Sequence, residues 1–217
     1  LGRGTFACQK GSQKMPLSEN DTIAMTSPSL NRKAQILAHS EEYAASRPDW
    51  RKKAEFFHGE DEAYLRFLIP ENARVLEIGC GIGDTLAALK PAHGVGIDFS
   101  PALVDIARKR HPDLTFVVGD AEDPATIASV QGPFDYILVL DAIGSLDDCQ
   151  KFLEQLHPLC SRETRVVIGY FSHLWQPVLK FAEWIGQRMP LPPQNALAPA
   201  DVAAIAQLAD FESVKPE

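Results

Sequence analysis

The sequence predicts an α/β fold with a doubly wound, mostly parallel sheet. Short apolar segments that end in an acidic residue alternate with segments of helical periodicity from residue 71 onward. The first of them, Val75 to Ile78, is followed directly by a glycine-rich loop and then by a helical pattern. Strands that alternate with helices favour parallel pairing, which places a ligand site at the carboxyl edge of the sheet.

The glycine-rich loop restricts the ligand that this edge could hold. Its pattern is E-x-G-x-G-x-G, carried by Glu77, Gly79, Gly81 and Gly83. A dinucleotide fingerprint would need glycine where Asp84 stands, and the lysine of a phosphate-binding loop is absent. An acid at the strand end suits ammonium and hydroxyl groups better than pyrophosphate. An ordinary glycine-rich turn is the alternative at this point.

Three further predicted strands also end in acids. They run from Gly94 to Asp98, from Leu114 to Asp120 and from Phe134 to Asp141. Asp98 follows the glycine loop at about the distance, roughly twenty residues, at which an acid holds a ribose in nucleotide-binding folds. We therefore predict Asp98 as a ribose ligand, with a solvent-facing loop acid as the alternative.

Composition excludes several classes of protein. The chain has 217 residues, of which 45% are apolar and 23% charged, as expected for a globular domain. Its net charge of −8 argues against general nucleic-acid binding. The basic run of Arg47 with Arg51 to Lys53 is more typical of a solvated helix face. The four cysteines lack C-x-x-C spacing, so we expect no metal site or disulfide and a cytoplasmic location. No apolar run reaches the ~20 residues of a membrane span.

We divide the chain into three regions. Residues 1–30 are polar and glycine-rich, which predicts a disordered lead-in. Residues 31–70 have helical periodicity and many aromatic side chains, which predicts a helical cap. Residues 71–217 form the α/β domain, with a fifth strand at Arg165 to Tyr170 and a sixth beginning at Phe211. The sequence stops there, so we expect a C-terminally incomplete domain.

These motifs resemble those of class I S-adenosylmethionine-dependent methyltransferases, which have a Rossmann-like fold. Two further segments, Ser172 to Pro177 and Met189 to Asn195, resemble the methyltransferase domain associated with bacterial family 2 glycosyltransferases. The resemblance implies S-adenosylmethionine as cofactor, a small-molecule or glycan-precursor acceptor in surface-polysaccharide synthesis, and a glycosyltransferase partner. The resembled fold closes with a seventh, antiparallel strand, which we expect this chain to lack.

The resemblance also assigns site residues. The cofactor would contact the loop and the strand ends at Glu77, Gly79, Cys80, Gly81, Gly83, Asp98, Phe99, Asp120, Ala121 and Asp141. In this set Asp120 would bind the adenine amino group, and the backbone amide of Ala121 would face the ring. If the reaction uses a base, Asp141 or His173 is best placed by topology. The acceptor pocket would include Tyr43, His58, Tyr170 and Trp175, for which packing is the alternative role.

Two other functions compete with methyl transfer. A short-chain oxidoreductase would carry a Tyr-x-x-x-Lys pair, and none of the four tyrosines is followed by lysine at that spacing. A non-catalytic methyltransferase-like partner of a glycosyltransferase stays open. The intact acids Glu77, Asp98 and Asp120 favour a working cofactor site over this alternative.

Overall fold

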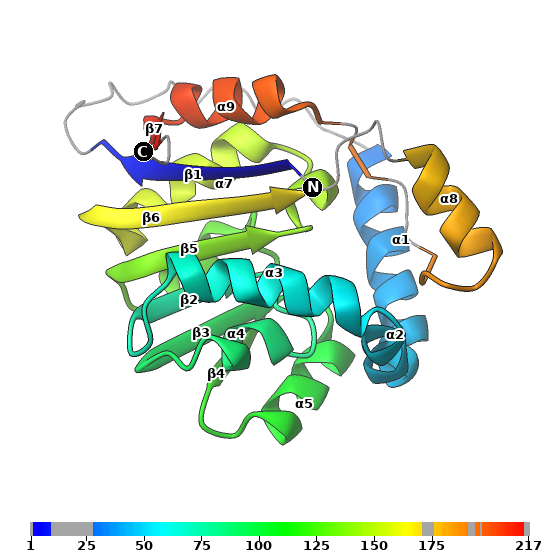
Figure 1. The fold of residues 1–217 in the computed structure, drawn as a ribbon. Coiled ribbons are helices and arrows are strands. Elements are labelled where there is room, and N and C mark those ends of the chain that lie inside the picture. The colour runs from blue at the N-terminus through cyan, green and yellow to red at the C-terminus, as the bar shows by residue number, and fades with distance from the viewer. Residues whose placement is uncertain (1, 10–27, 171–175, 191–193, 196, 215–217) are drawn as a thin grey trace.

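A computed structural model describes residues 2–9, 28–170, 176–190, 194–195 and 197–214. Within them, seven strands form one sheet in the order β4-β3-β2-β5-β6-β1-β7 (Figure 1). The strands are β1 (Gly2–Cys8), β2 (Arg74–Ile78), β3 (His93–Asp98), β4 (Thr115–Val118), β5 (Phe134–Leu140), β6 (Cys160–Tyr170) and β7 (Phe211–Ser213). Strands β2 to β6 pair in parallel, which confirms the predicted mostly parallel sheet.

Helices cover both faces of the sheet, as a doubly wound fold requires. The α-helices of the described residues are α1 (Pro28–Tyr43), α2 (Arg47–Lys53), α3 (Glu55–Leu68), α4 (Asp84–Ala88), α5 (Pro101–Arg110), α6 (Pro124–Ala128), α7 (Cys149–Gln155), α8 (Gln176–Trp184) and α9 (Pro199–Leu208). Of these, α1, α2 and α8 lie beyond the carboxyl ends of the strands (Figure 1). Local sequence signals explain where a helix begins, as α5 shows. The Ser100 hydroxyl accepts from the Leu103 N–H at 3.2 Å, and Pro101 occupies the first turn of α5.

The alternation of side chains along β2 places its apolar residues in two different core clusters, one on each face of the sheet. Leu76 and Ile78 join the larger cluster, which includes Phe152 of α7 and Val202 of α9. Val75 points to the other face and packs in a second cluster with residues of α3, α4 and α5. A central strand that is apolar on both faces therefore carries helices on both sides.

The strand β1 corrects two sequence-based expectations. Residues 2–8 are not a disordered lead-in, and the position of the final strand is filled, because β1 pairs antiparallel with both β6 and β7. Phe6 and Cys8, two residues apart on β1, point to the same side into the larger cluster, and both are buried. An unpaired β6 edge would expose a row of backbone groups, which β1 satisfies. Its glycine-rich, polar composition conceals this two-residue period, and residues 10–27 lie outside the described part.

We expect Phe6→Ala to lower the free energy of unfolding by about 3 kcal/mol, because Phe6 is only 3% exposed and its removal leaves a cavity. Urea unfolding followed by circular dichroism measures this loss. Phe67→Ala is the matched control, since Phe67 is 85% exposed and its truncation should cost less than about 0.5 kcal/mol. Equal stabilities for wild type and Phe6→Ala would contradict the place of β1 in the core.

Candidate active site

The glycine loop between β2 and α4 turns sharply at the carboxyl edge of the sheet. Gly79, Gly81 and Gly83 all have positive φ, at 74°, 55° and 79°, which other residues rarely adopt. A side chain at position 79 would lie 2.8 Å from the Ala142 Cβ, so this loop passes close to the segment after β5. Cys80 packs against Gly96 and is buried, so the structure gives its side chain a packing role.

Glu77, the penultimate residue of β2, carries a buried carboxyl group. It is 4% exposed, and its Oε2 atom has no hydrogen-bond partner among the described residues. Burial raises its pKa to about 8, although the charge of Arg51 and a hydrogen bond from the Leu86 backbone both oppose that shift. A buried acceptor without a donor is costly, so an incoming ammonium group would find a prepared partner here.

Asp98 links the first two loops of the edge. Its Oδ2 accepts from the Gly81 N–H at 2.7 Å, and its Oδ1 accepts from the Ser100 N–H at 2.9 Å. Burial raises the pKa of Asp98, while these bonds, the Phe99 N–H and the Arg47 charge act in the opposite direction. The backbone amides therefore orient the predicted ribose ligand before any cofactor arrives.

Asp120, at the end of β4, is paired with a residue that sequence reasoning missed. Lys33 of α1 lies 2.6 Å from the Asp120 Oδ2 and 3.0 Å from the Glu122 Oε2. Burial lowers the pKa of Lys33, but the hydrogen bonds to both acids outweigh it and raise that pKa. Ala121 is buried in the larger cluster. Helix α1 is thus attached to the loop that the resemblance assigns to adenine.

Helix α1 is also attached to the loops after β3 and β5. Glu41 accepts from the Ser100 hydroxyl at 2.6 Å, and Arg32 donates to the Gly144 carbonyl at 2.7 Å. Charged side chains of the predicted cap therefore contact three successive strand-end loops. The sequence shows charged residues along α1, but it does not show which residues they contact.

The basic run on α2 does not form the solvated helix face that its composition suggested. Arg47 and Arg51 are half-buried, whereas Lys52 and Lys53 are exposed. Burial lowers the pKa of Arg47, and the acids Asp98 and Asp141 oppose that shift. Arg51 contacts Glu62 at 2.6 Å and Asp84 at 3.2 Å. The four-residue spacing of the two arginines places them on one face of α2.

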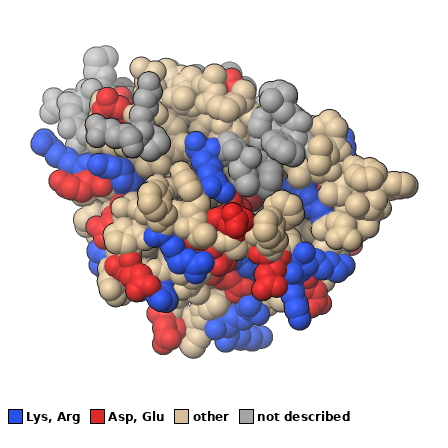
Figure 2. All heavy atoms as spheres, in the orientation of Figure 1, with Lys and Arg blue, Asp and Glu red and all other residues tan. Residues whose placement is uncertain are grey.

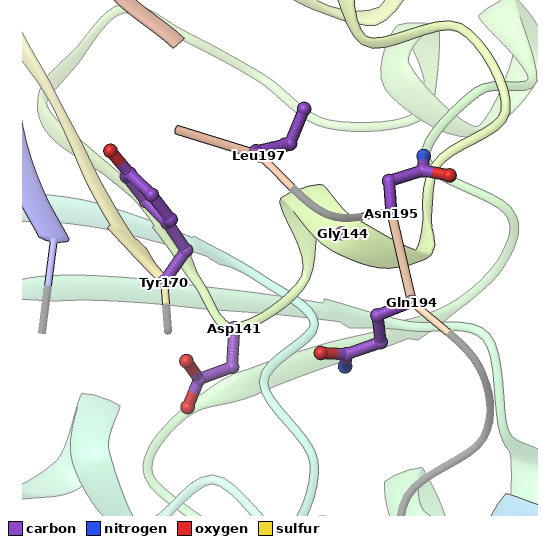
Figure 3. A pocket seen from close by; sticks show the side chains of 6 residues that line it. All are labelled: Asp141, Gly144, Tyr170, Gln194, Asn195 and Leu197. Carbon is purple, nitrogen blue, oxygen red and sulfur yellow. The ribbon is translucent and has the colours of Figure 1, made fainter. Parts of the chain in front are cut away.

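Asp141, after β5, lines an open pocket together with residues that come from distant parts of the chain. The pocket is formed by Asp141, Gly144, Tyr170, Gln194, Asn195 and Leu197 (Figure 3). Asp141 has a positive φ of 55°, and its N–H donates to the Gly169 carbonyl at 2.8 Å. Strained backbone of this kind is common at functional sites.

Asp141 is exposed to solvent, although many protein atoms surround its carboxyl group. Burial raises its pKa to about 6, and repulsion from Asp61 adds to the shift. The charges of Arg188 and Arg47 oppose it. A carboxyl group with this pKa can accept a proton near neutral pH.

Figure 3 shows how the other pocket side chains are directed. The Gln194 amide extends toward the same space as the Asp141 carboxylate, whereas the Tyr170 hydroxyl points away from that carboxylate. Asn195 is held by hydrogen bonds to the Gly144 and Leu146 carbonyls, at 2.7 and 2.8 Å. Tyr170 therefore forms a wall, and Gln194 is a polar pocket residue that sequence reasoning missed.

The remaining predicted residues divide into two groups. Tyr43 is half-buried at the end of α1 and stacks on His39 at 4.6 Å between ring centroids. His58 of α3 is half-buried, and burial together with the charge of Arg51 lowers its pKa to about 4. Their acceptor roles stay predictions. His173 and Trp175 lie outside the described residues.

The described residues contain no group of three or more His, Cys, Asp or Glu side chains that could hold a metal ion. No helix in this part of the chain is long and apolar enough to cross a membrane.

A profile of the methyltransferase domain family matches residues 50–215, which is most of the chain, so the protein belongs to that family. A magnesium-protoporphyrin O-methyltransferase of Rhodobacter capsulatus is 40% identical over 77 residues, covering 32% of each chain. A ubiquinone/menaquinone biosynthesis C-methyltransferase of Citrifermentans bemidjiense is 29% identical over 56% of this chain and 57% of its own. The matched region thus covers 32% of the length of the first relative and 57% of the length of the second.

Solved structures confirm the class I methyltransferase fold. A methyltransferase of Thermotoga maritima superposes with a TM-score of 0.65 and 21% identity, covering 82% of this chain and 81% of its own. The magnesium protoporphyrin IX methyltransferase of Synechocystis, solved with bound S-adenosylhomocysteine, has a TM-score of 0.58 and 17% identity, covering 82% and 89%. At these identities the likeness concerns the fold alone.

We expect Glu77→Gln to flatten the pH dependence of stability. An unfolded Glu77 loses its proton near the ordinary pKa of 4.5, whereas the folded one keeps it to about pH 8. Between these values the unfolded state binds fewer protons, so wild-type stability falls as pH rises, by up to about 1.4 kcal/mol per pH unit from this group.

Urea unfolding at several pH values between 5 and 8 measures this slope for wild type and Glu77→Gln. The matched control is Glu71→Gln, because Glu71 is exposed in a surface pair with Lys90. The same slope in wild type and Glu77→Gln would show that Glu77 is not the buried proton carrier.

Proposed function

We propose that this member of the methyltransferase family transfers a methyl group from S-adenosylmethionine to a small-molecule acceptor. The carrying observation is the unpartnered Oε2 atom of Glu77 at the same sheet edge as Asp98 and Asp120. Glu77 is the penultimate residue of β2, Asp98 ends β3, and Asp120 lies two residues after β4. These three strands are adjacent in the sheet. They form a row of acceptors suited to a ligand with several separate hydrogen-bond donors.

The donor groups of S-adenosylmethionine fit this row. Glu77 would accept from its ammonium group, Asp98 from its ribose hydroxyls and Asp120 from its adenine amino group. Arg47 is half-buried beside Asp98 and Asp141, and it would hold the carboxylate of the amino-acid end. Because the loop glycines lack side chains, the backbone can approach such a ligand closely.

Asp141 is the proposed base. When bound, the cofactor would supply a methyl group on a sulfonium. The sulfur would leave as a neutral thioether, which needs no help from a metal or an acid. The protein then has to position the acceptor atom and exclude water. Asp141 would take the proton of the acceptor. The Gln194 amide, directed into the same pocket, would orient the acceptor.

The acceptor class is proposed from the site and the relatives together. The Gln194 amide and the Asp141 carboxylate suit an acceptor that carries a hydroxyl or amino group. The relatives' names include O-, C- and N-methyltransferases, so they do not select one acceptor atom. A glycan precursor, with a glycosyltransferase as partner, is the finer proposal, and the sequence resemblance at residues 172–177 and 189–195 supports it.

We expect the chain to bind S-adenosylhomocysteine, and Asp98→Ala to weaken binding by about 1–3 kcal/mol, as for a lost hydrogen bond to a charged group. Isothermal titration calorimetry measures both affinities. Asp98→Asn is a second variant that keeps the side-chain shape. Asp105→Ala is the control, because Asp105 is an exposed acid on neighbouring α5.

Absence of binding to folded wild-type protein would refute the cofactor site and favour a non-catalytic partner domain. Equal weakening by Asp98→Ala and Asp105→Ala would remove Asp98 from the site. Binding without methyl transfer to any acceptor of the classes named above would favour the non-catalytic alternative.

We expect the rate of methyl transfer to rise with pH through about 6, because Asp141 must lose its proton to act as a base. Formation of S-adenosylhomocysteine measures kcat/KM across this range. Asp141→Asn should lower kcat/KM by about 10²-fold or more and remove the rise.

Asp61→Asn is the diagnostic partner variant. Repulsion from Asp61 raises the pKa of Asp141, so its removal should shift the rise to lower pH while the plateau rate changes little. A profile that Asp61→Asn and Asp141→Asn both leave unchanged would exclude Asp141 as the base.

A further inference from the structure

Helix α8 presents its apolar side to solvent, which reverses the usual orientation of an amphipathic helix. Val178, Phe181, Trp184 and Ile185 are all exposed, at positions three or four residues apart. Phe181 is 58% exposed and Trp184 is 81% exposed, and their rings lie 5.8 Å apart. A surface helix normally turns such a stripe toward the core, and large exposed apolar patches mark interaction sites.

The outward face of this segment, residues 177–190, has no exposed carboxylate. Glu183 is half-buried and pairs with Arg188 at 2.6 Å. Within residues 177–190, the only exposed charged side chain is that of Lys180. In a chain whose net charge is −8, this helix therefore exposes an aromatic and aliphatic face with a single positive charge.

The helix that carries this face lies at the same end of the molecule as the candidate active site (Figure 1). Helix α8 lies at the end of the molecule toward which the parallel strands point, near α1 (Figure 1). Figure 2 shows a projecting, largely uncharged lobe at this position. The chain then returns to the site, where Met189 is buried and its sulfur accepts from Arg47 at 3.4 Å.

We propose that the outward face of α8, formed by Val178, Phe181 and Trp184 together with Ile185 directly after the helix, docks on the surface of an anionic lipid bilayer. Tryptophan and phenylalanine insert favourably at the level of the lipid head groups, and Lys180 would contact lipid phosphates. No exposed carboxylate of residues 177–190 would oppose this contact. Docking would bring the end of the molecule that contains the Asp141 pocket close to the membrane, where a lipid-borne acceptor would be found (Figure 1).

A second copy of the chain fits this face less well. A stable interface buries about 800 Å² on each partner, and an aromatic side chain supplies at most about 250 Å². The two exposed aromatic residues of this nine-residue helix, with Val178 and the following Ile185, fall short of that area. Symmetric pairing would also bring two Lys180 side chains toward one another.

The test is co-sedimentation of the whole chain with lipid vesicles. Vesicles of phosphatidylcholine alone are compared with vesicles in which about one lipid in three is phosphatidylglycerol. We expect the anionic vesicles to bind wild type, and Phe181→Ser with Trp184→Ser to weaken that binding at least tenfold. Lys180→Gln should weaken it about fivefold on anionic vesicles only.

Phe67→Ser is the matched control, because Phe67 is an exposed aromatic residue at the far end of α3. It should bind as wild type does, and circular dichroism verifies that every variant is folded. Failure of folded wild type to bind anionic vesicles, or equal binding by the double variant, would overturn the proposal. A dimer in light scattering that the double variant abolishes, without vesicle binding, would assign the face to a second copy and also overturn it. The assay needs no cofactor, so its outcome is independent of methyl transfer.

Discussion

The candidate site depends on the parallel pairing of β2 with β3 on one side and with β5 on the other. In this register Ile78 lies opposite both Ile97 and Val139, so the residues that follow all three strands emerge at one edge. Adjacent strands are about 4.8 Å apart, which brings together loops that are far apart in the sequence. Asp98 then ties two of these loops by accepting from the N–H groups of Gly81 and Ser100. Without this register, the acids would be isolated loop residues.

Gathering carboxyl groups at one edge has an electrostatic cost, and the N-terminal helices offset it. Lys33 of α1 pairs with Asp120, while Arg47 of α2 lowers the pKa of both Asp98 and Asp141. Glu77 lacks such direct pairing, and burial raises its pKa to about 8. The edge therefore contains acids in different protonation states near neutral pH. A cationic ligand would compensate the carboxyl group that the protein itself leaves without a partner.

The chain between α8 and α9 connects two proposals that rest on different observations. Near its beginning, Met189 accepts a hydrogen bond from Arg47, and the charge of Arg188 acts on Asp141. Near its end, Gln194 lines the pocket. The preceding helix turns aromatic side chains outward at the same end of the molecule. A segment that lines the pocket and also carries an exposed apolar face could couple the location of the protein to the choice of acceptor.

The sequence by itself determined the parallel sheet, the glycine loop and the strand-end acids, because short continuous apolar runs, glycine spacing and acids at strand ends are local signals. Only the tertiary structure decided which strand pairs with β6 and which side chains contact the strand-end acids. β1 fills the antiparallel position beside β6 because an open edge accepts a strand from anywhere in the chain, and the glycines of residues 2–8 hide its periodicity. Arg47 and Arg51 look like a solvated basic run, yet they lie against acids from other elements. Lys33 and Gln194 reach the site across long sequence separations, which no local pattern encodes.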